Sequence, residues 1–256
     1  MYRFWAIITL IVTSCDVMGQ HLMEEPSINN GGPDCVLAIT FDEGGQKDWS
    51  VYASNPVLYR SSPGTNGPVR AGAKAGTKGW IGTSTTPNNN KLEIPNRKTL
   101  DAWYSLTCLM WEWKDPSIYN AFVYLISKNG DDAPMYFYNT HNVHGASTYG
   151  SSGAWMESAA STTTLTGRWN HIATQMEFTG PTNFTATQFA NGYLMTGAPD
   201  YHTGRAAPMR STAGPVRIFG EVSTYGLVGK ADDVRMYNAI IPLSRIREIV
   251  QYGKMP

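Results

Sequence analysis

After residue 33 the sequence alternates between short apolar runs and clusters of turn-forming residues. The runs are rich in the β-branched and aromatic side chains that favour strands; they read VLAITF, KLEIP, YSLTCLMWEW, AFVYLISKN, PMYFYN, WNHIATQMEF, VRIFGEV and ADDVRMY. Clusters such as SSPGTNGP, TSTTPNNN and KNGDDAP separate them, and their Gly, Pro and Asn residues are typical of turns. This pattern predicts an all-β fold, a single β-sandwich.

The pattern changes only near the C-terminus, where apolar residues recur at helical spacing, at Leu243, Ile246, Ile249 and Val250. Ser244 is a suitable N-cap for this segment, and Gly253 is a suitable stop signal. We therefore expect one short C-terminal helix. The sequence contains no internal repeat and no interdomain linker, so we expect a single domain.

The N-terminal residues are typical of a secretory signal peptide. Arg3 supplies an early positive charge, and an apolar run over 4–12 follows that is too short to span a bilayer. Val17 and Gly19 are small enough to place a cleavage site before Gln20. The sequence therefore predicts an exported, extracellular protein.

Residues 12–15, Val-Thr-Ser-Cys, also resemble a bacterial lipobox, and that alternative would leave Cys15 lipidated at the mature N-terminus. On the signal-peptide interpretation, 1–19 is the signal peptide, 20–34 is an N-terminal segment and 35–256 is the folded domain.

The amino-acid composition argues against two classes of partner, nucleic acids and membranes. Hydrophobic residues make up 42% of the chain, enough for a sizeable core, while charged residues make up only 16% and the formal net charge is zero. No basic patch interleaved with aromatic residues is present, so we expect no nucleic-acid partner. Neither an acidic tail nor a basic membrane-surface helix is present, and no apolar segment is long enough to span a membrane.

Two cysteines remain after the signal peptide, Cys35 and Cys108. An even number of cysteines in an exported protein favours a disulfide, which would close a loop of roughly 70 residues and stabilise by up to about 4 kcal/mol. The alternative is a pair of buried free thiols. Asn183 opens the only N-x-[ST] sequon, Asn183-Phe184-Thr185, and is therefore the candidate glycosylation site.

The order of several segments resembles a laminin-G-like domain of the concanavalin A-like lectin/glucanase superfamily. The segments are AITFDEGG, KLEIPNRKTL, SLTCLMWEWKDP, GRWNHIATQ, ANGYLMTG and GKADDVRMYNAIIPLSRIREI. The resemblance covers residues 35–256 and implies a two-sheet antiparallel jelly roll. It aligns Trp111 with the tryptophan of the long central strand and makes His171 a structural strand residue. Residues 179–190 depart from the pattern, being longer and less regular than usual.

A catalytic role is disfavoured by the arrangement of acidic residues. Retaining glycosidases need two carboxylates about 5 Å apart, and in this fold they cluster on one strand face. Glu112 and Glu157 each stand alone, and Asp131-Asp132 falls in an expected loop. His141 and His144 form the motif HNVH, which we interpret as a polar loop rather than a metal site. The sequence therefore predicts a protein that is not an enzyme, with a glycoside hydrolase as the least favoured alternative.

A binding role is better supported. Period-2 alternation allows Trp113, Tyr136 and Tyr138 to form one aromatic platform, a kind of surface on which sugars stack. The alternative is that loops cover these rings. We predict a secreted recognition module whose partner is an extracellular glycan or matrix protein. A structural component of an extracellular matrix, mineralised or not, is the alternative.

Asp232 and Asp233 stand side by side in the last strand-like segment. Alternation places Asp232 with Val234 toward the core and Asp233 with Arg235 outward, so the two carboxylates diverge and a catalytic pair is disfavoured. A core-facing carboxylate needs hydrogen bonds or a cation. We favour hydrogen bonds. The family resemblance implies the alternative, a structural calcium held by Asp232 and Asp42, and no other cofactor is indicated.

Overall fold

The structure is a computed structural model, and the part of the chain that it describes is discontinuous. The described residues are 35–41, 48, 50, 52, 57–59, 67–69, 74, 79–82, 91–101, 104–116, 123–128, 136–139, 143–151, 155–161, 166–197, 199–204, 207–209, 213–219 and 229–252. Residues 1–34, which include the predicted signal peptide and Cys15, lie outside it. Among the described residues, no helix is long and apolar enough to cross a membrane.

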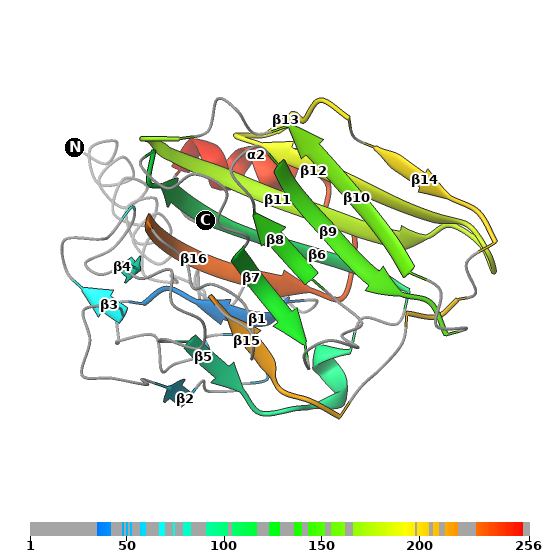
Figure 1. Ribbon diagram of the computed structural model, residues 1–256, viewed down its shortest axis with the longest axis horizontal. Helices are drawn as coiled ribbons and strands as arrows, with labels where there is room; N and C mark the ends of the chain where they lie inside the picture. Colours follow the sequence, from blue (N-terminus) through cyan, green and yellow to red (C-terminus); the bar gives the residue numbers. More distant parts are fainter. Residues whose placement is uncertain are drawn as a thin grey trace, which may run out of the picture.

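Two antiparallel sheets form the body of the molecule, which confirms the predicted all-β sandwich (Figure 1). Sheet A has the order β13-β12-β11-β6-β16-β4-β3, with β1 also paired to β16 and β14 to β12. Its strands are β1 (Cys35–Ile39), β3 (Gly67–Val69), β4 (Gly79–Gly82), β6 (Ser105–Lys114), β11 (Trp169–Phe178), β12 (Phe184–Ala190), β13 (Tyr193–Leu194), β14 (Asp200–His202) and β16 (Gly229–Tyr237).

Sheet B has the order β10-β9-β8-β7-β15-β5-β2. Its strands are β2 (Val57–Tyr59), β5 (Lys91–Ile94), β7 (Val123–Lys128), β8 (Tyr136–Asn139), β9 (Val143–Tyr149), β10 (Trp155–Ser161) and β15 (Val216–Ile218). A 3-10 turn, η2 (Lys98–Leu100), precedes β6, and the helix α2 (Leu243–Tyr252) ends the described chain. The helix confirms the predicted C-terminal helix, although it begins at Leu243, so that Ser244 lies in its first turn rather than at its cap.

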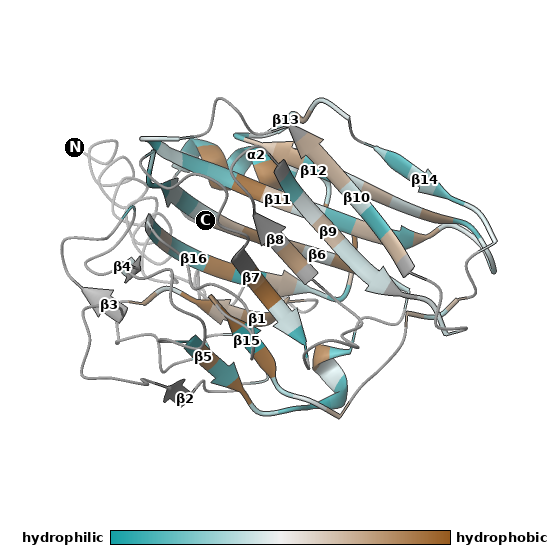
Figure 2. Ribbon diagram, in the orientation of Figure 1, coloured by the Kyte–Doolittle hydropathy of each residue, from teal (hydrophilic) through white to brown (hydrophobic). Residues whose placement is uncertain are grey.

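The main core lies between the sheets and is filled from alternate positions of the long strands. In β6 these positions are Leu106, Cys108 and Met110, all fully buried. Trp80 and Phe219 pack with ring centroids 4.9 Å apart inside the same cluster. The resulting alternation is visible as brown and teal bands along the strands (Figure 2).

A second, smaller cluster lies on the outer face of sheet A, where α2 covers it. Ile246 and Ile249 of the helix join Leu109, Ala173 and Phe189 of the sheet. The odd-numbered positions of β6 therefore face the helix, and the even-numbered positions face sheet B. This assignment of faces decides where each candidate site residue points.

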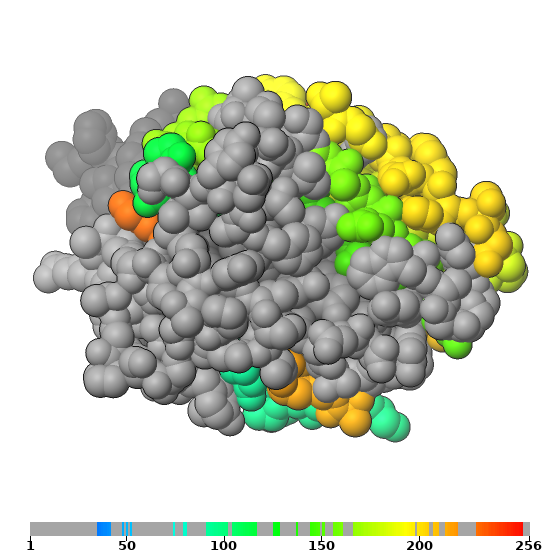
Figure 3. Space-filling view, in the orientation of Figure 1, coloured from blue at the N-terminus to red at the C-terminus, as the bar shows by residue number. Residues whose placement is uncertain are grey.

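Strands β12, β13 and β14 form one rim of the sandwich, seen in yellow at the upper right of the space-filling view (Figure 3). The irregular stretch begins with a short turn, but β12 then pairs with β11 in regular register from Phe184 to Ala190. The next hairpin turns at Asn191 and Gly192, whose φ values of 52° and 78° confirm the NG turn that the sequence indicates.

The predicted disulfide is wrong for this structure, because Cys35 and Cys108 are both free and buried. Strand β16 lies between β1 and β6, which places their backbones about 9–10 Å apart, too far for a disulfide. The two thiols also face opposite sides of sheet A, Cys35 in the helix-side cluster and Cys108 in the main core. The alternative of two buried thiols is the one observed.

Candidate binding site

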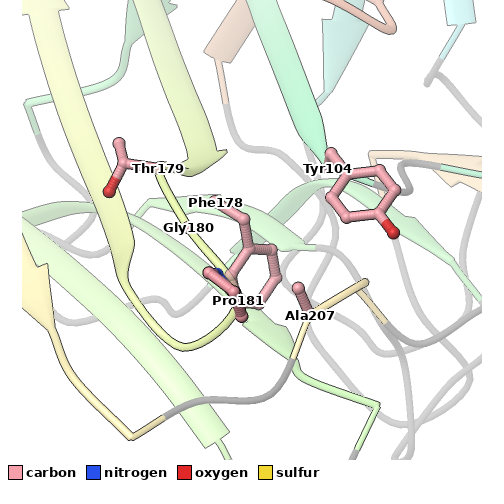
Figure 4. A pocket seen from close by; sticks show the side chains of 6 residues that line it. All are labelled: Tyr104, Phe178, Thr179, Gly180, Pro181 and Ala207. Carbon is pink, nitrogen blue, oxygen red and sulfur yellow. The ribbon is translucent and has the colours of Figure 1, made fainter.

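A pocket of about 450 Å³ opens at the end of the sandwich where β6 begins and β11 ends. Its described lining consists of Tyr104, Phe178, Thr179, Gly180, Pro181 and Ala207 (Figure 4). The volume lies within the range of small-ligand sites in proteins, roughly 300–1,000 Å³.

Three segments that are distant in the sequence build this pocket, and main-chain hydrogen bonds hold them together. The N–H of Phe178 donates to the carbonyl of Tyr104 at 2.8 Å, which joins the end of β11 to the start of β6. The N–H of Ala207 donates to the carbonyl of Pro181 at 2.9 Å, which fixes the third wall. The pocket is therefore supported by backbone pairing rather than by side chains alone.

The lining combines a buried floor with an exposed aromatic ring. The ring of Phe178 packs edge-on against Phe184, with centroids 5.4 Å apart, and is nearly buried. The side chain of Tyr104 is 59% exposed, and in Figure 4 it lies across from Phe178 and Ala207. The exposed ring of Tyr104 is thus available for contact with a ligand that enters.

None of the described lining residues carries a charge. The side-chain polar groups among them are the hydroxyls of Tyr104 and Thr179, and the remainder of the surface is apolar or main chain. The described part of the lining offers no carboxylate, imidazole or amine, and it suits a small neutral ligand with an apolar face and several hydroxyl groups.

The residues of the predicted aromatic platform are divided between the two sheets. Trp113 lies half-buried on the outer face of sheet A, directly opposite Trp169, and the ammonium of Lys230 is 4.9 Å from its ring centroid. Tyr136 and Tyr138 belong to β8 of sheet B, and their side chains lie outside the described residues. Trp113 and the two tyrosines therefore belong to different sheets, and a platform that combines them stays a prediction. Alternation within each strand carries no information about which sheet the strand joins.

Glu112 and His144 form a contact that the sequence interpretation missed. Nε2 of His144 lies 3.1 Å from Oε2 of Glu112, with 1% and 2% of the side chains exposed. The pair bridges β6 of sheet A and β9 of sheet B. The HNVH motif is therefore not wholly a loop, since β9 begins at Val143, although His141 lies outside the described residues.

Lys114 lies on the same face of β6, two residues from Glu112. Burial lowers the pKa of Lys114 to about 8, and the Glu112 carboxylate acts in the opposite direction. These groups are sealed between the sheets, so they are not accessible to a substrate in this structure. One signal for this contact is present in the sequence: Glu112 is spaced two residues from Met110 and four from Cys108, so it lies on the same face of the strand as these core residues.

A β-bulge in β16 overturns the predicted directions of the two adjacent aspartates. The register with β6 shifts between Asp232 and Arg235, and Asp233 adopts a positive φ of 47°. Asp232 therefore lies opposite Trp111 on the outer face, together with Arg235, whereas Val234 faces the core. Asp233 does not point into solvent, because only 3% of it is exposed.

Hydrogen bonds engage both oxygens of Asp232 but only one oxygen of Asp233, whose buried Oδ2 has no hydrogen-bond partner among the described residues. Asp232 accepts the N–H of Lys74 at Oδ2 and the N–H of Asp233 at Oδ1, each at 2.8 Å. Asp233 accepts from Nε of Arg235 at 2.7 Å. These contacts account for the burial of Asp232 without a cation. Asp42 lies outside the described residues, so the calcium alternative stays a prediction.

His171 is a structural strand residue, as the family resemblance implies. It is buried in β11, and its ring packs edge-on against Trp111 with centroids 5.2 Å apart. Burial, together with the charge of Arg235, lowers the pKa of His171 to about 3. The imidazole is therefore neutral at physiological pH.

Comparison with known proteins places the fold but not a family. No family model matches the chain, and no curated protein matches it. A solved binding domain of Paraclostridial Mosquitocidal Protein 1 is similar, with a TM-score of 0.61 and 12% identity over 86% of this chain. The receptor binding domain of botulinum neurotoxin C/D mosaic serotype gives a TM-score of 0.63 and 8% identity over 86% of this chain.

The chain spans about half the length of these toxin domains, 52% and 51%. Domain 4 of AbnA, a GH43 extracellular arabinanase from Geobacillus stearothermophilus solved in complex with arabinotriose, matches over its whole extent. The TM-score is 0.57 and the identity 16%, over 85% of this chain and 98% of that domain. At such identities the likeness shows a shared fold, a β-sandwich found in domains that bind receptors or saccharides.

Proposed function

We propose that this protein is a non-catalytic recognition module that binds a neutral saccharide in the pocket beside Tyr104. The observation that carries the proposal is the exposed Tyr104 ring facing a pocket of about 450 Å³ with no charged group in its described lining. Sugar rings present apolar faces that stack on aromatic rings, and their hydroxyls pair with the hydroxyl and main-chain groups at the rim.

The comparisons support the class of function. The toxin domains are named as binding domains, and the arabinanase domain holds arabinotriose. The property proposed for this chain is the general one, a β-sandwich that binds a target. The proposal that the target is a neutral saccharide rests on the pocket itself.

We also propose that the protein is exported through its N-terminal segment and meets an extracellular glycan or matrix glycoprotein. The resemblance to laminin-G-like domains supports this site of action. The pattern of Arg3 followed by the apolar run over 4–12 supports export.

Calorimetric titration of the mature chain with neutral trisaccharides of arabinose, xylose, glucose and N-acetylglucosamine tests the proposal. Tyr104→Ala should weaken binding at least tenfold, equivalent to about 1.4 kcal/mol. Tyr252→Ala is the matched control, because that tyrosine is 61% exposed on α2, away from the pocket. Equal binding by both variants would contradict the pocket assignment.

A second surface has its own supporting observation. Trp113 and Trp169 lie directly opposite each other on sheet A, and both are half-buried. Tryptophan is enriched at protein interfaces relative to the rest of the surface. If Trp113→Ala weakens attachment to matrix extracts while Tyr104→Ala leaves it unchanged, a structural matrix role replaces the saccharide-binding one.

A further inference from the structure

The glycosylation sequon lies at the edge of the candidate binding pocket. Asn183 is exposed and ends the turn that joins β11 to β12. Its carbonyl accepts the N–H of Thr179 at 3.0 Å, so the turn closes on itself. Thr179, Gly180 and Pro181 of this turn line the pocket.

The side chain of Asn183 extends over that wall. Its Nδ2 atom lies 3.8 Å from the position that a Cβ on Gly180 would occupy. Nδ2 is the atom to which an N-linked glycan is attached. The point of attachment therefore lies beside Gly180, one of the residues that line the pocket.

The rest of the sequon holds Asn183 in place. Phe184 is buried and packs against Phe178, the floor of the pocket. Thr185 is half-buried and lies between Glu177 of β11 and Tyr201 of β14 in the sheet. Because the two following residues are fixed in β12, Asn183 has little freedom to carry an attached sugar away from the pocket.

We propose that Asn183 carries an N-linked glycan whose first sugars cover the pocket and exclude an external saccharide. This inference rests on the proposed function. In the transfer, Nδ2 of Asn183 forms a bond to C1 of the first sugar of a lipid-linked oligosaccharide diphosphate. The bond from C1 to the phosphate oxygen breaks, the lipid diphosphate leaves with the electron pair, and the amide loses one proton.

The physical basis is tethering. A sugar attached by a short linker has an effective concentration in the millimolar range near its own pocket. Individual saccharides stacked on one aromatic ring bind weakly, so a tethered sugar competes well with a free one even before steric exclusion. Removal of the glycan would therefore act as a switch that opens the site.

The test uses the full chain secreted from a eukaryotic host. The comparison is between the parent protein, Asn183→Gln, Thr185→Ala, and parent protein treated with a peptide-N-glycosidase. Thr185→Ala is the matched variant, because it removes the sequon and keeps Asn183. Peptide mass spectrometry measures occupancy at Asn183, and calorimetry measures the affinity for the four neutral trisaccharides named above.

We expect an occupied Asn183 in the parent protein and roughly tenfold tighter trisaccharide binding in the other three samples. An unmodified Asn183 overturns the inference, as does equal affinity of the modified and unmodified forms. If Asn183→Gln and the enzymatically deglycosylated protein bind no trisaccharide at all, the proposed function itself fails. If they bind and the modified parent binds equally well, the function stands and only the regulatory role of the glycan is lost.

Discussion

Asp233 and Arg235 form a buried ion pair, in which Nε of the guanidinium lies 2.7 Å from Oδ1 of the carboxylate. The side chain of Arg235 is 1% exposed and that of Asp233 is 4% exposed. The pair is made possible by the bulge in β16, which turns Asp233 back toward its neighbour two residues on. The two charges neutralise each other in a place where neither can be hydrated.

Asp233→Ala should therefore destabilise the protein by about 3–5 kcal/mol, because it leaves the guanidinium buried without its partner. Urea denaturation measures the change. Glu248→Ala is the control, because it breaks an exposed ion pair between Glu248 and Arg245 on α2. The side chain of Arg245 is 35% exposed and that of Glu248 is 45% exposed, so the loss of this pair should cost less than about 1 kcal/mol. Similar losses for the two variants would show that the buried pair is not a strong contributor.

Asp232→Ala should also be costly. The change leaves the N–H groups of Lys74 and Asp233 without their acceptor, at about 1–3 kcal/mol for each unpaired group. Asp232→Asn retains one acceptor and should cost less. If hydrogen bonds alone satisfy Asp232, the Tm of the parent protein is the same with calcium and with a chelator; a rise in calcium would favour the cation instead.

The cysteines should behave as inaccessible free thiols. Burial raises the pKa of Cys35 to about 12 and the pKa of Cys108 still further. Little thiolate is present at neutral pH, so the native protein should resist iodoacetamide, whereas denaturation without reductant should make both residues alkylatable. A Cys35–Cys108 linked peptide in the non-reduced digest would show that the oxidised protein differs from this structure.

Acid should destabilise the protein through His171. Its pKa is about 3 in the folded state and near 6.5 when unfolded, so the unfolded state binds the proton first as pH falls. Stability is retained above pH 6.5 and lost as pH falls toward 3, at up to about 1.4 kcal/mol per pH unit. His171→Phe keeps a ring against Trp111 and should flatten the profile of unfolding free energy between pH 7 and 4. An unchanged slope would assign the acid sensitivity to other groups.

Gly229 should not tolerate a side chain. Its φ is 143°, and an added Cβ would lie 2.2 Å from the carbonyl oxygen of Trp113 on the paired strand. Gly229→Ala should destabilise by more than about 2 kcal/mol, because backbone must move to relieve the contact. Gly204→Ala is the control that separates the cost of a positive φ from the cost of the steric contact. Gly204 also has a positive φ, +70°, but nothing lies within 4 Å of its Cβ position. Equal Tm values for the two variants would mean that the contact relaxes easily.

The sequence by itself determined the fold class, most of the long strands, the C-terminal helix and the NG hairpin. These features depend on local preferences: β-branched and aromatic runs for strands, 3.6-residue spacing for α2, and a positive φ at Asn191 and Gly192 for the turn. Strand β9 was missed because VHGASTY is too small and polar to resemble a core strand. Its burial comes from its neighbours in sheet B.

Only the tertiary structure decided the sites. The pocket joins Tyr104, Phe178 and Ala207, which are far apart along the chain and brought together by main-chain pairing. Glu112 meets His144 because two sheets stack face to face. The bulge at Asp233 reverses the alternation that a strand pattern assumes, and it moves Asp232 to the opposite face. Side-chain alternation fixes direction only relative to the neighbouring residues; which sheet a strand joins, and where its register slips, depend on long-range packing.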